Sequence, residues 1–113
     1  MIEAVIYHNR KKELCGYRIC GHAGFAKKGE DIVCSAVSVL TINTVNAIEQ
    51  LTTTPFQCNA DEKQGGYLEV ICSDMKKGIK DHDAELLLKA MVMGLEDLSK
   101  EYQKYIRLKY EEV

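Results

Sequence analysis

Cys34 and His22, which lie twelve positions apart, are the residues of this sequence best suited to chemistry. The thiolate is the nucleophilic form of cysteine, and a helix N-terminus or a neighbouring cation lowers the pKa of the thiol. Cys34 lies near the start of an apolar segment that predicts a helix, and His22 opens the glycine-rich segment that leads into it. A flexible connector lets the two side chains meet. They therefore form a candidate Cys–His dyad for nucleophilic acyl transfer.

Two polar residues flank Cys34 in the predicted helix. Asp31 is expected to cap the helix N-terminus, and its carboxylate can also orient His22. Ser38 follows Cys34 by one turn on the same face, where its hydroxyl either lines an open site or bonds back to a helical carbonyl. A cysteine on an apolar helix is often a packing residue, so these positions alone leave a packing role for Cys34 open.

The remaining cysteines, Cys15, Cys20, Cys58 and Cys72, contain no CxxC pair. Cys15 and Cys20 have opposite parity within one predicted strand and therefore point to opposite faces, which disfavours a shared metal ion. We expect no metal site. Five cysteines are an odd number, and the first residues lack the basic region of a secretory signal, so a reducing, cytoplasmic setting is expected.

Composition limits the class of protein. The 113 residues match one domain, 1–113, and 46% hydrophobic residues indicate a folded globular chain. The formal net charge is −2 and the isoelectric point about 5.9, which disfavours a binder of nucleic acid that neutralises many phosphates. The sequence also suggests no segment of the roughly 20 apolar residues that a membrane span needs. We therefore expect no direct contact with nucleic acid and none with a membrane.

Six elements are needed to position Cys34 and His22. Alternating apolar residues predict four strands in two hairpins, and helical periodicity predicts two helices. Ile32 to Ile48 is a run of seventeen residues without a formal charge. In chain order the predicted elements are a strand over 1–8, a strand over 14–20, a helix over about 32–48, strands over 56–60 and 67–73, and a helix over about 81–109.

This order, β-β-α-β-β-α, predicts an α+β domain with an antiparallel sheet and two helices packed on it. A helix that is apolar on most sides is buried on most sides, so the first helix is expected to be central and buried. It fits either between the sheet and the second helix or in a dimer interface. Whether both helices share one face of the sheet stays open at this point.

The segment Gly21-His22-Ala23-Gly24-Phe25-Ala26, followed by Gly29-Glu30-Asp31-Ile32-Val33-Cys34-Ser35-Ala36-Val37-Ser38, closely resembles the ribosomal-processing cysteine proteases of the Prp family. The resemblance extends over essentially the whole chain. It implies a cysteine endopeptidase that removes an N-terminal extension from a large-subunit ribosomal protein, works without a cofactor and forms a homodimer. Cys34 would be the nucleophile and His22 the general base and acid. The positions that match the family motif near them are Gly21, Gly24, Asp31, Ser35 and Ser38.

Two other readings of the same residues are consistent with the sequence. The chain fits a non-catalytic module that binds a ribosomal protein, in which Cys34 only packs. It also fits a peroxide sensor that uses the same activated thiol, with Cys20 as the nearest resolving cysteine. Replacement of Cys34 by serine separates the first alternative from a protease, because serine nearly preserves the side-chain volume while removing the thiolate.

Overall fold

A computed structural model describes residues 1–21, 30–61 and 66–113, with the side chains of residues 30 and 31 left out of the description. It contains one five-stranded sheet and three helices. The elements are β1 (Ile2–His8), β2 (Leu14–Cys20), α1 (Glu30–Leu51), β3 (Gln57–Asp61), β4 (Tyr67–Ile71), α2 (Ser73–Lys76), α3 (His82–Glu101) and β5 (Ile106–Glu112).

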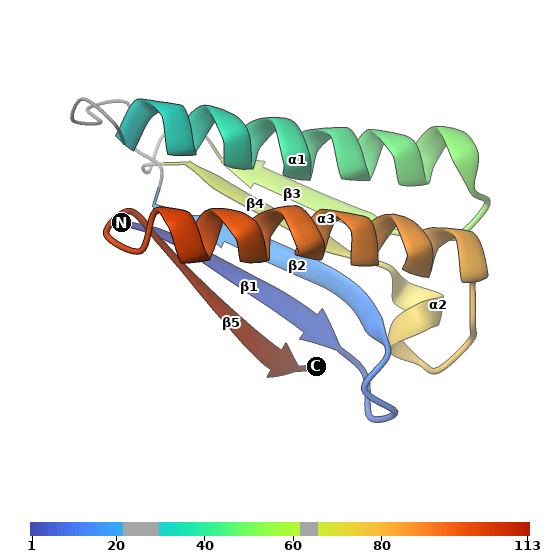
Figure 1. Cartoon of the computed structure of the whole chain (residues 1–113). Helices are drawn as coiled ribbons and strands as arrows, with labels where there is room; N and C mark the ends of the chain where they lie inside the picture. Colours follow the sequence, from blue (N-terminus) through green and yellow to red (C-terminus); the bar gives the residue numbers. More distant parts are fainter. Residues whose placement is uncertain (22–29, 62–65) are drawn as a thin grey trace.

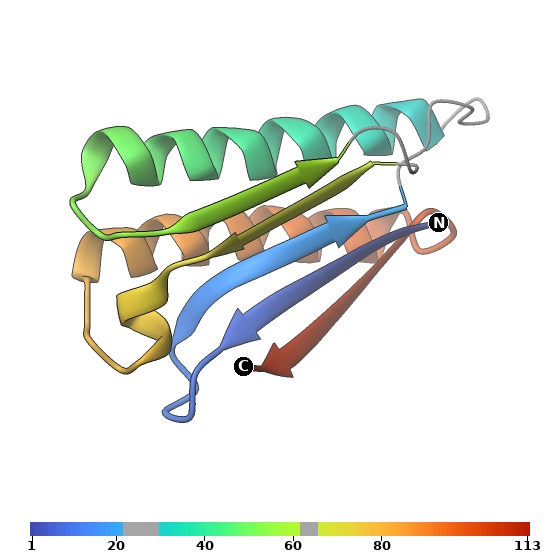
Figure 2. The same ribbon diagram turned by 180° about the vertical axis from the view of Figure 1, so that it is seen from behind.

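The sheet has the strand order β3-β4-β2-β1-β5. Both predicted hairpins form: β1 pairs with β2, β3 pairs with β4, and the hairpins join through antiparallel β2 and β4. Helices α1 and α3 lie side by side on one face of the sheet (Figure 1), and the view from behind shows the strands in front of both (Figure 2). The α+β prediction is therefore confirmed, and the two long helices share one face.

The core lies between the sheet and these helices. Ile2, Ala4 and Ile6 alternate along β1 and are fully buried, as their two-residue period predicts. Val33 and Val37 of α1 also have no exposed surface and belong to the same core. Burial of an aliphatic side chain of this size contributes about 1.5–3 kcal/mol, so these contacts hold α1 firmly against the sheet.

Helix α1 is less buried than its composition predicts. Its sheet-facing residues are buried, but Ile32, Val39 and Ile42 are 64%, 67% and 50% exposed. Residues 32–51 are long and apolar enough to cross a membrane by length and composition alone. In the structure this segment is a layer of the core, one side packed on the sheet. The expectation of a central helix enclosed on most sides is thus wrong, because α3 lies beside α1 and leaves its outer face uncovered.

The C-terminal segment also differs from the prediction. Asp81 accepts a hydrogen bond from the Ala84 amide at 3.0 Å and caps α3 as expected, but the helix ends at Glu101. Residues 106–112 form β5, which runs parallel to β1, so the sheet is mixed and not purely antiparallel. Ile106 and Leu108 alternate with charged residues, which is the period of a strand. Over so short a stretch the same residues also fit the apolar side of a helix, so the sequence pattern does not separate the two. β1 would otherwise be an edge strand with unpaired backbone N–H and C=O groups. Residues 106–112 form a strand because they pair with these groups.

Candidate active site

The site predicted from the sequence lies at the end of the sheet where α1 begins. β2 ends at Cys20, β4 begins at Tyr67, and the chain from β2 leads into the start of α1 (Figure 1). His22 and Gly24 lie outside the described residues. The structure therefore describes the residues on either side of this segment: Gly21 before it and the first turns of α1 after it.

Cys34 is the fifth residue of α1, since the helix begins at Glu30. Its side chain is partly exposed and packs against the core. Side chains in a helix tilt toward its N-terminus, so the sulfur lies nearer the positive end of the helix dipole than its position along the backbone suggests. Contact with the core fixes the side chain in place next to the first turn of α1.

Three supporting residues take different places on α1. Asp31 is the second residue of the helix and so lies inside the first turn, because the helix starts two residues earlier than an Asp31 cap requires. Ser38 follows Cys34 by one turn and is also partly exposed, so the two share a flank of the helix. Ser35 is exposed and lies about a quarter-turn further round the helix. Ser38 can therefore line the site with Cys34, whereas Ser35 faces outward.

Gly21 is held tightly at the end of β2. Its φ of +92° is a conformation that favours glycine, and its amide donates a hydrogen bond to the carbonyl of Gly66 at 3.3 Å. A Cβ atom at this position would lie 2.4 Å from the backbone oxygen of Met1. Since His22 follows directly, the backbone of Gly21 sets where the chain carrying the imidazole leaves the sheet.

A cavity of about 390 Å³ adjoins this junction, and the sequence reasoning did not anticipate it. Its walls come from the end of β3, the start of β4 and the last residue of β2. The available signal in the sequence was the Gly65-Gly66 pair, because glycine is typical of the turns that connect strands. The cavity is lined by Cys20, Asn59, Ala60, Asp61, Gly66 and Tyr67.

The cysteines other than Cys34 show why one thiol stands apart. All five are present as thiols. Cys15 and Cys72 are fully buried, and burial raises the pKa of Cys15 to about 11 and that of Cys72 to about 12. These two thiols are inert packing residues, in contrast to the partly exposed Cys34 at its helix start.

Metal binding receives no support from the part of the chain that the structure describes. There, no three His, Cys, Asp or Glu side chains gather so that they could hold a metal ion. Cys15 is buried in the core, and Cys20 is partly exposed beside the cavity, as their opposite parity predicts. The chemistry that the described residues offer at this end of the molecule is therefore that of the thiol.

Comparison with known proteins places this arrangement in a family. The family model for the cysteine protease Prp matches residues 1–107. The ribosomal processing cysteine protease Prp of Staphylococcus aureus (strain Mu50) is 32% identical over 110 residues, which cover 97% of this chain and 99% of that protein.

Two solved structures of the S. aureus protease Prp share the fold. One is a complex with a substrate peptide (TM-score 0.87, 30% identity), the other a complex with a covalently linked product peptide (TM-score 0.84, 32% identity). Each match covers 98% of this chain and 100% of the other chain. With this coverage, both structural matches include β2, which leads to His22, and α1, which carries Cys34. This chain belongs to the Prp family of cysteine proteases.

Proposed function

We propose that this cysteine endopeptidase removes the N-terminal extension of a large-subunit ribosomal protein, with Cys34 as nucleophile and His22 as general base and acid. The observation that carries the proposal is the position of Cys34, partly exposed in the second turn of α1, a helix that begins at the same end of the molecule at which β2 ends and leads to His22. Support also comes from the S. aureus relative, named for ribosomal processing and solved with a covalently linked product peptide.

The proposed reaction is acyl transfer in two steps. The Cys34 thiolate attacks the scissile carbonyl carbon, and the His22 imidazolium gives its proton to the departing amine as the C–N bond breaks. Water then attacks the thioester while His22 takes its proton, which releases the acid product and returns the thiolate. Backbone N–H groups in the first turn of α1 lack helical partners and suit the oxyanion that forms in both steps. The residues in these roles require no cofactor.

We assign the 390 Å³ cavity to the substrate peptide. It adjoins Gly21 through Cys20 and Gly66, and Tyr67 offers an aromatic surface on its wall. An aromatic side chain of the substrate peptide would stack on or against this ring. The cavity then contributes to specificity by holding the residue next to the scissile bond.

The direct test is cleavage of the substrate. The purified protein, kept reduced, is incubated with the large-subunit ribosomal protein of its own organism carrying its N-terminal extension. Mass spectrometry should show loss of the extension alone, and the same ribosomal protein made without the extension should keep its mass. An extended protein that stays intact in the presence of a fully reduced enzyme would contradict the proposed function.

We also place the enzyme in the cytoplasm. A thiolate nucleophile needs reducing surroundings, and disulfides form mainly outside the cytosol. All five cysteines are thiols in the structure, including the exposed Cys58 on edge strand β3. This arrangement suits a compartment in which exposed thiols stay reduced.

We further propose that two copies pair through the outer face of α1. Ile32, Val39 and Ile42 follow one another at helical spacing on that face and are half or more exposed. Sedimentation velocity should report a mass near twice 12.7 kDa for the native chain and near 12.7 kDa for Ile42→Asp. Leu86→Asp, at an equally exposed position on α3, is the control and should leave the dimer intact. A dimeric Ile42→Asp protein would exclude this face as the interface.

A further inference from the structure

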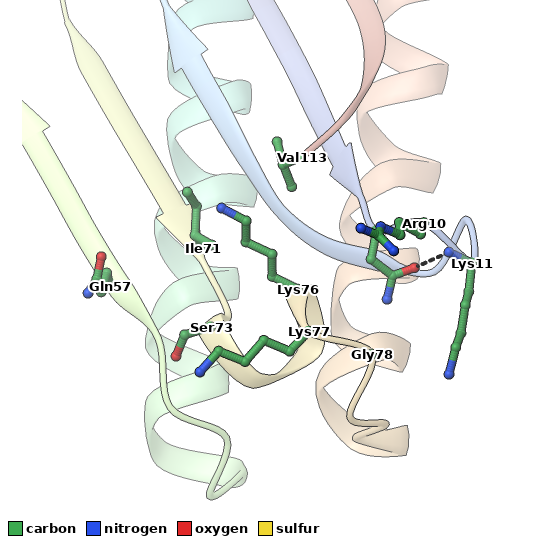
Figure 3. Close-up of a pocket in the computed structure, with 10 residues that line it drawn as sticks. Arg10, Lys11, Gln57, Ile71, Ser73, Lys76, Lys77, Gly78 and Val113 are labelled. Atoms are coloured by element: carbon green, nitrogen blue, oxygen red, sulfur yellow. Dashed lines mark hydrogen bonds between the residues drawn. The ribbon is translucent and has the colours of Figure 1, made fainter.

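A second, larger cavity lies at the opposite end of the molecule from the start of α1. It has a volume of about 700 Å³ and lies between the β1–β2 turn, the start of β3, the end of β4, and helix α2 (Figure 3). We call it the basic cavity. Its lining residues are Asn9, Arg10, Lys11, Gln57, Ile71, Ser73, Lys76, Lys77, Gly78 and Val113.

Four of these side chains are cationic and none is a carboxylate. Arg10 and Lys11 come from the β1–β2 turn, and Lys76 and Lys77 come from the end of α2. All four are exposed, and no carboxylate of the described residues forms an ion pair with them. The chain as a whole carries a net charge of −2, so these four cations form a local positive patch on a weakly acidic protein. Unneutralised like charges repel one another, which favours an anionic ligand among them.

A buried asparagine fixes the two walls of the basic cavity relative to each other. Asn9 is 2% exposed, and its amide donates to the carbonyl of Met75 next to the α2 lysines at 2.8 Å. Its side-chain oxygen accepts from the amides of Lys11 and Glu13 at 2.9 and 3.0 Å. The hydrogen bonds of Asn9 therefore hold the backbone segments that carry the cations in a fixed arrangement before a ligand binds.

The side chains around the cavity match those that contact phosphate. Lys76 extends toward Ile71 and Val113, and Lys77 extends toward the hydroxyl of Ser73 (Figure 3). Arginine and lysine together with serine and glutamine are the residue types that bind phosphate oxygens of nucleic acids. No aromatic side chain is among the lining residues, so bases have no ring to stack on. The ligand that fits these residues is therefore a phosphate backbone, bound without regard to base sequence.

We propose that the basic cavity is an exosite for the phosphate backbone of RNA. The choice of RNA over an acidic peptide rests in part on the proposed function, because a ribosomal protein in its particle lies next to RNA. The net charge of −2 argues against a phosphate-binding surface over the whole chain, but four cationic side chains line this one cavity. This proposal departs from the expectation of no direct contact with nucleic acid, because it places such a contact at this one cavity.

The exosite leaves the peptidase site free. Helix α1 has 22 residues, about 33 Å at 1.5 Å per residue, and it begins at the Cys34 end of the molecule. The basic cavity lies at the other end, near the start of α3 (Figure 1). RNA in the cavity would therefore hold the enzyme on its particle without covering Cys34, so cleavage of a free peptide should not depend on these cations.

Binding is measured by fluorescence anisotropy with a labelled single-stranded RNA of about 20 nucleotides and mixed sequence. Contacts to three or four phosphates predict a slope of about −2 to −3 for the logarithm of the association constant against that of salt concentration. In low salt, Lys76→Glu/Lys77→Glu should weaken binding at least about tenfold and reduce the slope by more than 1. The control, Lys100→Glu/Lys104→Glu, changes net charge equally at exposed sites near the far end of α3 and should bind within about twofold of the native chain.

The same variants separate a lost exosite from a lost fold. Lys76→Glu/Lys77→Glu should keep the native melting temperature and cleave a free peptide at the native rate. If α2 unfolds in that variant, Arg10→Gln/Lys11→Gln on the opposite wall must weaken RNA binding instead. Equal loss in the control variant, absence of binding, or stronger competition by polyglutamate or a nucleoside triphosphate than by RNA would overturn the proposal. The binding assay needs no peptidase activity, so its result is independent of the proposed function.

Discussion

Replacement of Cys34 by serine or alanine should lower kcat/KM for the extended ribosomal protein by at least about 10⁴-fold, because loss of the nucleophile leaves only binding and oxyanion stabilisation. Serine nearly preserves the volume of the side chain, so the contacts of Cys34 with the core stay and the fold should be retained. Substrate binding should be unchanged, measured by anisotropy with a labelled extension peptide.

Cys58→Ser is the matched control for this experiment. Cys58 lies on the exposed edge strand β3 and is not among the residues of either cavity, so its loss should leave kcat/KM unchanged. A Cys34→Ser protein that cleaves at the native rate would instead support the non-catalytic module, in which this sulfur only packs.

His22→Ala tests the other half of the dyad. Residues that act as one unit are strongly non-additive, so His22→Ala combined with Cys34→Ala should be little slower than Cys34→Ala alone. Equal and independent losses that multiply in the double variant would indicate that the two residues do not act on the same step. The comparison needs only single-turnover cleavage rates of the three variants.

The parts of the fold that the sequence predicts well depend on local patterns. Alternation places both hairpins, and the periodicity of residues 32–48 finds α1. β5 escapes prediction because its partner, β1, lies at the other end of the chain, and pairing over that separation leaves no local signal. The exposed face of α1 escapes for a similar reason, because composition reports how apolar a helix is but not which neighbours cover it.

The candidate site divides in the same way. Cys34 is identified from its residue type and its place at a helix start, both of which are local. The cavity beside Tyr67 and the basic cavity are built from segments far apart in the chain, such as Arg10 and Lys76, whose proximity depends on the Asn9 contact with the Met75 carbonyl. A net charge of −2 describes the whole sequence and conceals a cluster of four cations at one end.

Gly21→Ala should impair both stability and catalysis, which distinguishes it from substitutions that affect only one. The φ of +92° makes any L side chain strained, and the new Cβ would meet the Met1 oxygen at 2.4 Å, where only backbone can give way. A strained backbone of this kind costs about 1–3 kcal/mol, so the free energy of unfolding should fall by that amount. Because His22 is the next residue, a shift of about 1 Å should also cost about 100-fold in kcat/KM.

Gly78→Ala is the control, because it introduces backbone strain at a site away from His22. Gly78 also has a positive φ, +98°, and it lies in the loop after α2. A Cβ atom there would lie 3.5 Å from the flexible end of the Lys11 side chain. The substitution should lower the free energy of unfolding by about 1–2 kcal/mol and leave kcat/KM unchanged at temperatures where the protein is folded. Urea unfolding and peptide cleavage measured on both variants decide the matter. If Gly21→Ala is as active as Gly78→Ala, the backbone at the end of β2 does not position His22, and the imidazole must reach Cys34 by a path that tolerates a displaced strand end.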